Sequence, residues 1–436
     1  MLRMLTLLTL ALWATTARAE INIQEVTSAG GINAWVVSEP SIPFVAMEIR
    51  FRGGASLDEP GKRGAVNMMT GLLEEGAGDM TAQEFQTARE GLAASYRFRA
   101  SDDSLSISAR FLTENKEEAL ELLRKALIEP RFDEDAIDRV RAQIIASINA
   151  DMLDPNNIAS DTFYSVSYGD HPYGSAIEGT VESVSALTRD DLIAAHQNVL
   201  TRDRLVVSVV GDTTAETVGE MLDTLLGDLP TTGPSAPVDL AYDYPGGITV
   251  VDFDVPQSVA FFGQRGLERD DPDFFAAFIM NHILGAGGFE SRLFQEVRVE
   301  RGLTYGIGTF LVPKFHSELL LGSVASSNET VGEAIEVTKA EFARMAAEGV
   351  TEEELAAAKT YLTGEYPMRF DGNAEIARIM AGMQMVGLPP DYVVDRNAFV
   401  EEVTLEDVNR VAATLLAPED LHFVVVGKPV GLVSTN

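Results

Sequence analysis

Cysteine is absent from the 436 residues of this chain. Disulfide bonds, thiolate catalysis, cysteine-ligated metal and a lipoprotein anchor are therefore excluded, and the fold must rest on its apolar cores. Histidine is scarce, and no two of the five lie within five positions of each other: His171, His196, His282, His316 and His422. A pair of imidazoles one helical turn apart, as in many zinc sites, is therefore excluded as well.

Basic residues are few, with 33 Lys and Arg against 67 Asp and Glu, which gives a formal net charge of −34. Phosphate binding requires clustered Lys and Arg, so the balance argues against nucleic acid and anionic lipid headgroups as partners. A surface of this sign would attract basic peptides, but the same charge also serves solubility alone.

Long apolar runs are missing after the N-terminus. There, Arg3 precedes an apolar stretch from Leu5 to Trp13, and Ala17-Arg18-Ala19 follows it. This is the plan of a secretory signal peptide, which we expect to be residues 1–19. The stretch is too short to cross a bilayer, which needs about 20 residues. We therefore expect a periplasmic or secreted protein without a membrane span.

The chain repeats itself. Residues 187–192 correspond to residues 403–408, and residues 205–211 correspond to residues 421–427, at a constant offset of 216. In both copies Thr precedes a helical stretch whose first turn carries acids, and a β-branched run then ends at Gly. These patterns predict a capped helix followed by a buried strand, and hence a duplicated fold.

A Pro-, Thr- and Gly-rich segment, Leu229–Pro237, separates the two copies and indicates a linker. We predict an N-terminal lobe over residues 20–229, a linker over 230–245 and a C-terminal lobe over 246–436. Residues 104–112 alternate polar and apolar side chains, as a half-buried strand does. The order of such segments predicts an α+β fold of two homologous lobes, each an antiparallel sheet with helices packed on one face.

Four motifs, in this order on a duplicated plan, carry a family resemblance: Gly53–Gly61, Tyr168–Gly174, Ser291–Arg298 and Arg301–Tyr305. With them the chain resembles the pitrilysin/insulinase metallopeptidases, in particular their short-subunit bacterial and processing-peptidase branch. The resemblance extends over nearly all of the chain that follows the expected signal peptide.

Active members of that family carry an inverted H-x-x-E-H helix, in which two His ligate zinc and the Glu activates water. In the matching segment, Asn67 and Gly71 occupy the His positions and Thr70 the Glu position. Near the position of the third ligand, Ala146-Ser147-Ile148 contains no acid. Glu74 and Glu75 offer only carboxylates, which suit zinc poorly, and we interpret them as a solvated helix end. The resemblance thus implies a chain that binds no metal.

The resemblance also implies a role for the second lobe. In two-chain members one subunit holds zinc, and the other supplies an Arg and a Tyr, which match Arg298 and Tyr305 here. A Tyr hydroxyl can donate to a substrate carbonyl that develops negative charge. An Arg can hold backbone carbonyls or a carboxylate. Spacing alone would give neither residue a role.

The glycines within Leu284–Phe289 are not a phosphate-binding loop, because no Gly-Lys-Ser/Thr follows and no βαβ pattern surrounds them. We interpret this segment as a closely packed turn before a helix that begins at Ser291. A hinge or a substrate-facing loop is the alternative.

Two hypotheses about function follow. In the first, the chain is the non-catalytic subunit of an exported heterodimeric zinc peptidase, and its partner carries zinc on an H-x-x-E-H helix. A closed chamber would admit peptides and exclude folded proteins. In the second, the chain is an inert binding or scaffold protein of the same fold. An independently active peptidase would need the metal site that is missing here.

Overall fold

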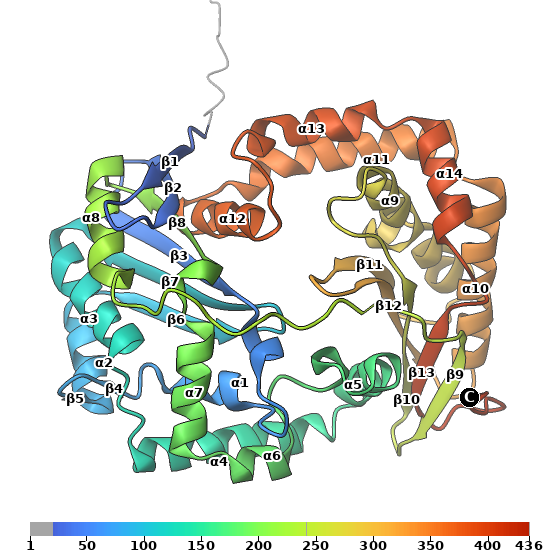
Figure 1. The fold of residues 1–436 in the computed structure, drawn as a ribbon. Coiled ribbons are helices and arrows are strands. Elements are labelled where there is room, and N and C mark those ends of the chain that lie inside the picture. The colour runs from blue at the N-terminus through green and yellow to red at the C-terminus, as the bar shows by residue number, and fades with distance from the viewer. Residues whose placement is uncertain (1–20, 241, 436) are drawn as a thin grey trace, which may run out of the picture.

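The structure is a computed structural model that describes residues 21–240 and 242–435. The expected signal peptide, residues 1–19, lies outside these residues. Two lobes stand side by side, and each contains a sheet with helices around it (Figure 1). This confirms the predicted α+β fold of two lobes.

The first sheet has six strands in the order β1-β2-β8-β3-β7-β6. Their bounds are β1 (Gln24–Thr27), β2 (Asn33–Ser38), β3 (Phe44–Arg52), β6 (Ser95–Ala100), β7 (Ser104–Leu112) and β8 (Leu205–Gly211). The alternating segment is β7, and its apolar side chains are the buried ones. Neighbouring strands are antiparallel except β2 and β8.

The second sheet has five strands in the order β11-β12-β10-β13-β9. Their bounds are β9 (Gly247–Asp252), β10 (Gln257–Arg265), β11 (Ile307–Pro313), β12 (Glu318–Ser327) and β13 (His422–Gly427). Only β9 and β13 pair in parallel. The two repeated β-branched segments are β8 and β13, and each joins its sheet after a long helical connection, which is what parallel pairing requires.

The helices of each lobe bury their apolar sides against one face of its sheet. In the first lobe these are α1 (Ala65–Leu72), α2 (Ala82–Gly91), α3 (Lys116–Ile128), α4 (Glu134–Asp151), α6 (Val181–Ala186), α7 (Arg189–Val199) and α8 (Ala215–Leu226). In the second they are α9 (Phe274–Asn281), α10 (Val331–Glu348), α11 (Glu352–Glu365), α13 (Tyr392–Glu402) and α14 (Leu405–Leu415). The repeated Thr residues, Thr188 and Thr404, form capping boxes at the starts of α7 and α14, as predicted.

One helix of the first half packs against the sheet of the other lobe. This helix, α5 (Pro155–Tyr168), lies against β10 and β13, and in Figure 1 it stands between the lobes. Its Phe163 is fully buried in a cluster with Val424 and Leu321. Helix α5 therefore covers the face of the second sheet that the helices of its own lobe leave open.

A helix of the second half makes the reciprocal exchange. Helix α12 (Asn373–Met385) packs on β3 and β8, and its Met380 joins Trp35 in an apolar cluster. Arg52 Nη2 donates to the Gln384 carbonyl at 2.7 Å, and Gln384 Nε2 donates to the Val207 carbonyl at 2.9 Å. The two lobes are thus interlocked, and both faces of each sheet carry helices, where the sequence predicted only one covered face.

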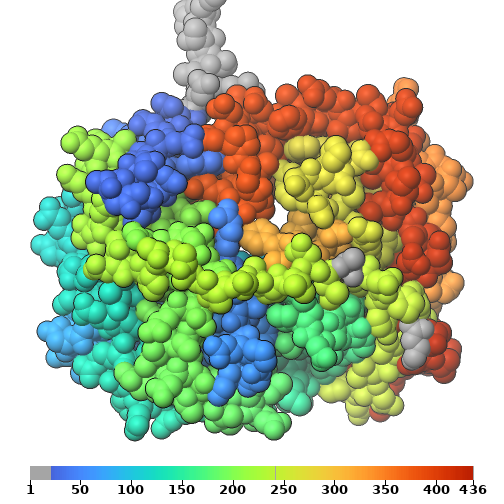
Figure 2. Space-filling model, viewed as in Figure 1, coloured from blue at the N-terminus to red at the C-terminus, as the bar shows by residue number. Residues whose placement is uncertain are grey.

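The described residues between Leu226 and Gly247 form no helix or strand. In Figure 2 this yellow-green segment crosses the surface of both lobes. Its first part is tied to the first lobe by bonds from Arg202 N to the Pro230 carbonyl, at 2.9 Å, and from Gly233 N to Asp203, at 3.2 Å. None of the helices in the described part of the chain is long and apolar enough to span a bilayer.

Candidate functional site

The segment that matches the family's metal helix is α1. Thr70 is buried, and its hydroxyl donates to the Val66 carbonyl at 2.7 Å, so it faces the helix backbone. Beside Gly71 stands Val140 of α4, since a Cβ atom built on Gly71 would lie 3.5 Å from Val140 Cγ1. Two turns further along α4, Ser147 is exposed. The two His positions of the family motif therefore hold a half-buried Asn67 and an exposed Gly71, with Val140 beside Gly71.

The two acids after α1 are engaged in ion pairs. Glu74 pairs with Arg89 and Glu75 pairs with Arg139. Burial raises the pKa of the Glu74 carboxyl above its usual range, and Arg89 opposes that rise. Both carboxylates are half-buried, so the interpretation as a solvated helix end is wrong. Neither acid is free to ligate a cation.

The five His residues are held elsewhere. His196 bonds the Leu127 carbonyl at 2.8 Å, His282 stacks on Tyr361 at 5.1 Å, and His422 is buried against Thr249. Across the described ranges, no three His, Cys, Asp or Glu side chains are grouped so that they could hold a metal ion. The residues present at α1 do not fit zinc, and no hydrolytic step can be derived through a metal on this chain.

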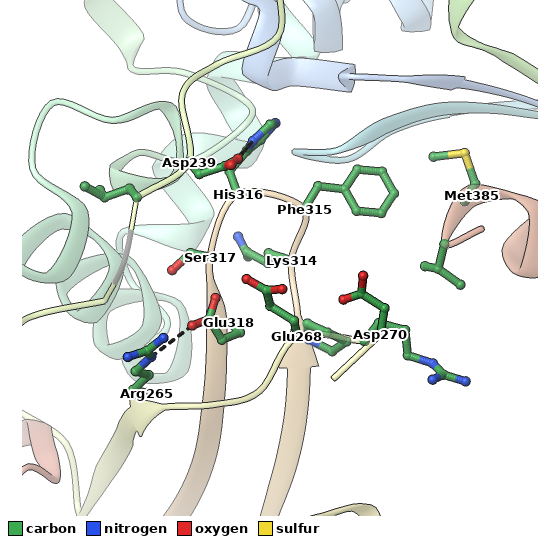
Figure 3. Close-up of a pocket in the computed structure, with 14 residues that line it drawn as sticks. Asp239, Arg265, Glu268, Asp270, Lys314, Phe315, His316, Ser317, Glu318 and Met385 are labelled. Carbon is green, nitrogen blue, oxygen red and sulfur yellow. Dashed lines mark hydrogen bonds and ion pairs between the residues drawn. The ribbon is translucent and has the colours of Figure 1, made fainter. Parts of the chain in front are cut away.

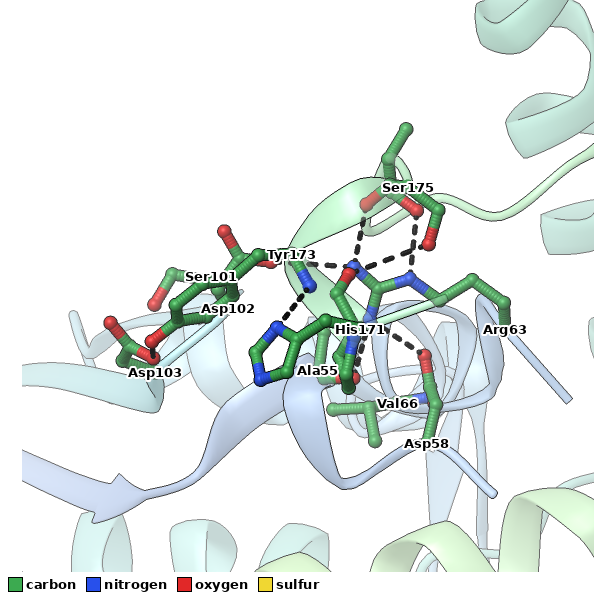
Figure 4. A network of polar contacts seen from close by, with 12 residues as sticks. Ala55, Asp58, Arg63, Val66, Ser101, Asp102, Asp103, His171, Tyr173 and Ser175 are labelled. Atoms are coloured by element: carbon green, nitrogen blue, oxygen red, sulfur yellow. Dashed lines mark hydrogen bonds and ion pairs between the residues drawn. The ribbon is translucent and has the colours of Figure 1, made fainter. Parts of the chain in front are cut away.

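Two of the family-like motifs hold α1 in place instead. Asp58 accepts from Val66 N at 2.8 Å and from Gly64 N at 3.0 Å, which satisfies backbone donors at the start of the helix. Arg63 donates to the carbonyls of Ala55 and Ser175 at 2.5 and 2.8 Å (Figure 4). These contacts join the loop at 53–61 to the segment after α5, so the motifs have a structural role in this chain.

In the second lobe, Arg298 lies in a π-helical turn, η7 (Phe294–Val299). Its guanidinium carbon lies 4.8 Å from the ring centroid of Phe294 and 5.8 Å from that of Phe289. Among the described residues no carboxylate pairs with Arg298. Tyr305, in the connection from η7 to β11, is 82% exposed. The structure therefore places both predicted residues on one short segment with their polar groups available.

Two family models match the chain in sequence. The model of the insulinase family, peptidase family M16, matches residues 35–181, and that of the peptidase M16 inactive domain matches residues 186–362. The chain belongs to the insulinase (M16) peptidase family.

Curated M16 relatives match along almost their whole length. A Helicobacter pylori protein named non-peptidase homolog YmxG is 27% identical over 397 residues, which cover 88% of this chain and 89% of that protein. An uncharacterized zinc protease of Mycobacterium leprae is 26% identical over 406 residues, which cover 92% and 91%. Relatives at similar identity thus carry opposite names, so function has to be argued from the site.

Two solved structures have the same fold. A peptidase M16 inactive domain from Pseudomonas fluorescens superposes with a TM-score of 0.88 at 27% identity and covers 95% of this chain and 99% of its own. A chain of complex III2 from Candida albicans gives a TM-score of 0.75 at 14% identity and covers 93% and 96%. The second likeness shows the fold alone.

Strand β11 of this M16 chain is an edge of the second sheet and follows directly after Tyr305. Its Phe310 is 51% exposed. The edge of a sheet presents unpaired backbone N–H and C=O groups, to which an extended peptide can add as a further strand. Sequence reasoning missed this surface, because an edge is defined by the pairing of distant strands.

The junction where the two lobes meet was not predicted from the sequence either. Lys314 lies at the tip of the β11–β12 hairpin, and its Nζ atom is 2.6 Å from Oδ2 of Asp102, at the tip of the β6–β7 hairpin. His171 and His316 come together there with ring centroids 6.4 Å apart. Beside this junction lies a cleft of about 460 Å³, into which Glu268 and Asp270 project (Figure 3).

Proposed function

We propose that this chain is the non-catalytic subunit of an exported heterodimeric M16 peptidase. The observation that carries the proposal is a contrast between the two lobes. In the first lobe, the positions of the two His ligands hold Asn67 and Gly71, and Val140 packs beside Gly71. In the second, Arg298 and Tyr305 keep their polar groups available. The name of the Helicobacter pylori relative, a non-peptidase homolog, supports a non-catalytic role.

In the proposed complex, the partner is an M16 chain that carries H-x-x-E-H and holds the zinc. The Tyr305 hydroxyl would donate a hydrogen bond to the scissile carbonyl oxygen as negative charge develops on it. Arg298 would fix the substrate through its N–H groups. Both roles require side chains that reach beyond their own lobe, and the 82% exposure of Tyr305 is consistent with that.

The substrate class that suits this surface is an unfolded or short peptide. The free edge of β11 would bind its backbone, and Phe310 would contact its side chains. The net charge of −34 would favour the approach of basic peptides.

The experiment is to mix the purified chain with its zinc-bearing partner and to follow cleavage of an unstructured peptide. Neither chain alone should cleave. Tyr305→Phe should lower kcat of the mixture about 100-fold, the effect of losing one donor to an oxyanion. Tyr361→Phe, at another exposed tyrosine (58%), is the matched control and should leave kcat unchanged. Equal turnover by the Tyr305 and Tyr361 variants would remove the role assigned to Tyr305.

Export is part of the proposal and has its own measurement. Residues 1–30 fused to a reporter that is active only outside the cytoplasm should give activity, and the change Leu8→Arg in the apolar stretch should abolish it.

The second candidate is an inert scaffold, and the interlocked lobes favour it. The exchange of α5 and α12 buries apolar clusters between the lobes within this chain alone. Size-exclusion chromatography of the co-expressed chains, followed by a peptidase assay of the eluted complex, decides between the two. A complex without any peptidase activity would favour the scaffold.

A further inference from the structure

The glycine-rich segment before Ser291 has an unusual backbone. Two π-helical turns, η5 (His282–Ala286) and η7 (Phe294–Val299), flank the 3₁₀ turn η6 (Gly288–Glu290). π-Helical turns are rare in proteins, and those that occur are often found at functional sites. Arg298 lies in the second of them. The sequence interpretation of a packed turn therefore accounts for only part of this segment.

This turn is fixed by side chains of the helix that follows it. Ser291 Oγ donates to the Gly288 carbonyl at 2.8 Å, and Gln295 Nε2 donates to the Phe289 carbonyl at 2.6 Å. Gly288 adopts a φ of +59°, which glycine tolerates without strain. The backbone of Phe289 is thus held in one place, although its ring is 68% exposed.

The ring of Phe289 borders the guanidinium of Arg298. Its centroid lies 4.8 Å from that of Phe294 in an edge-to-face contact, and both rings lie within 6 Å of the Arg298 guanidinium carbon. At these distances an aromatic face attracts a cation. Two aromatic residues therefore restrict where the Arg298 guanidinium can lie.

The neighbouring arginines are paired with carboxylates. Arg292 forms two bonds with Glu354, at 2.6 and 2.7 Å, and Arg301 pairs with Glu296 at 2.6 Å. Within the described residues Arg298 has no such partner, although the chain has twice as many acids as bases. When a planar guanidinium lies against aromatic rings, the N–H groups along its edge remain able to donate hydrogen bonds. Two of these N–H groups match the two oxygens of a carboxylate.

We infer that Phe289 and Phe294 are positioning residues that hold Arg298 ready for a carboxylate of the bound peptide. The carboxylate is either the C-terminal group of the peptide or an Asp or Glu side chain. The inference rests on the proposed function for the assignment of Arg298 to the peptide site. Its test needs only this chain, because it concerns binding and not cleavage.

The experiment measures the binding of three labelled decapeptides to the isolated mature chain by fluorescence anisotropy. All three are unstructured and rich in Lys. The first has a free C-terminus and no acid, the second is the same peptide with an amidated C-terminus, and the third is amidated and contains one internal Glu. Tighter binding of the first than of the second, by about tenfold for a bidentate pair, identifies the C-terminal carboxylate. Tighter binding of the third than of the second identifies the side chain.

The variants separate positioning from folding. Arg298→Gln should abolish the difference between the peptides. Phe289→Leu should reduce it about threefold by removing the aromatic face, and Phe289→Trp should restore it. Phe399→Leu, at a half-exposed ring that contacts Phe275 and Tyr392, should change nothing.

Equal affinity of the three peptides for the unaltered chain, or no binding of any, would overturn the inference. Equal discrimination by the Leu and Trp variants would overturn the role of Phe289. If the isolated chain discriminates but its mixture with the zinc-bearing partner does not cleave, the proposed function fails and the inference stands.

Discussion

The exchange of α5 and α12 predicts that the two lobes unfold together, and Phe163→Ala tests this. Phe163 belongs to the first half of the chain, but its ring is fully buried in the second lobe. It lies 5.3 Å from Phe261 and 6.2 Å from Tyr242 between ring centroids. A Cβ atom built on Gly263 would lie only 2.8 Å from Phe163 Cζ, so the ring packs where Gly263 has no side chain. Loss of such a ring costs about 3–5 kcal/mol of unfolding free energy.

The chain supplies its own reporter for the other side of the exchange. Its two tryptophans are Trp13, in the expected signal peptide, and Trp35. Trp35 is buried against Met380 of α12, so in the mature protein its fluorescence reports whether α12 is docked on the first sheet. Urea unfolding is followed at once by this fluorescence and by far-UV circular dichroism.

In Phe163→Ala the midpoints of both signals should move together to lower urea concentration. The dependence of the unfolding free energy on urea should be unchanged, and both signals should report the same loss of about 3–5 kcal/mol, because the lobes unfold as one cooperative unit. Met368→Ala, at a side chain that is 74% exposed, should stay within about 0.5 kcal/mol of the unaltered protein. If the Trp35 transition keeps its midpoint while the dichroism splits into two steps, the lobes unfold separately and the argument from exchange is refuted.

Two further predictions concern the second lobe. Thr404→Ala should cost about 1 kcal/mol of unfolding free energy by urea titration, because Asp407 N loses its acceptor at 3.1 Å, while Thr404→Ser should retain most of it. Burial lowers the pKa of His422 to about 4 in the folded chain, whereas the unfolded chain binds that proton near its ordinary pKa of about 6.5. Unfolding free energy should therefore fall by about 3 kcal/mol as the pH drops from about 6.5 to about 4, and His422→Gln should flatten that part of the pH profile.

Local patterns predicted the elements of this fold well. Thr188 and Thr404 cap α7 and α14 through side-chain bonds that depend only on the next three residues. The runs at β8 and β13 are buried strands, as their β-branched content and their short length predict. In both cases the cause lies within a few residues of the effect.

Pairings between distant segments could not be predicted in the same way. The apolar side chains of α5 indicate that it must be buried, but they do not say against which sheet. His171 and His316 are far apart in the sequence and meet only because the segment after α5 lies beside the tip of the β11–β12 hairpin. The contact of Arg298 with Phe289 and Phe294 depends on a π-helical turn, for which the sequence carries no recognised signal.

The residues that pack α1 into the core are distinct from Asn67 and Gly71, the two residues at the His positions of the family motif. Val66, Met68, Met69 and Leu72 are buried in the core, whereas Asn67 is half-buried and Gly71 is exposed. The two His positions therefore contribute little to the core, whereas Thr70, at the Glu position, is buried with the packing residues.

Gly71→Ala tests this separation. The new Cβ would meet Val140 at an ordinary contact distance of 3.5 Å, and Ala favours the helix over Gly by about 0.5–1 kcal/mol. Unfolding free energy should rise by that amount in urea titration. In the mixture with the zinc-bearing partner, kcat and KM should stay unchanged, since no chemistry is assigned to this face. A loss of stability would mean that α4 lies too close to accept a methyl group. A loss of activity with stability intact would mean that α1 still contributes to the substrate site, and the division of labour between the two lobes would have to be abandoned.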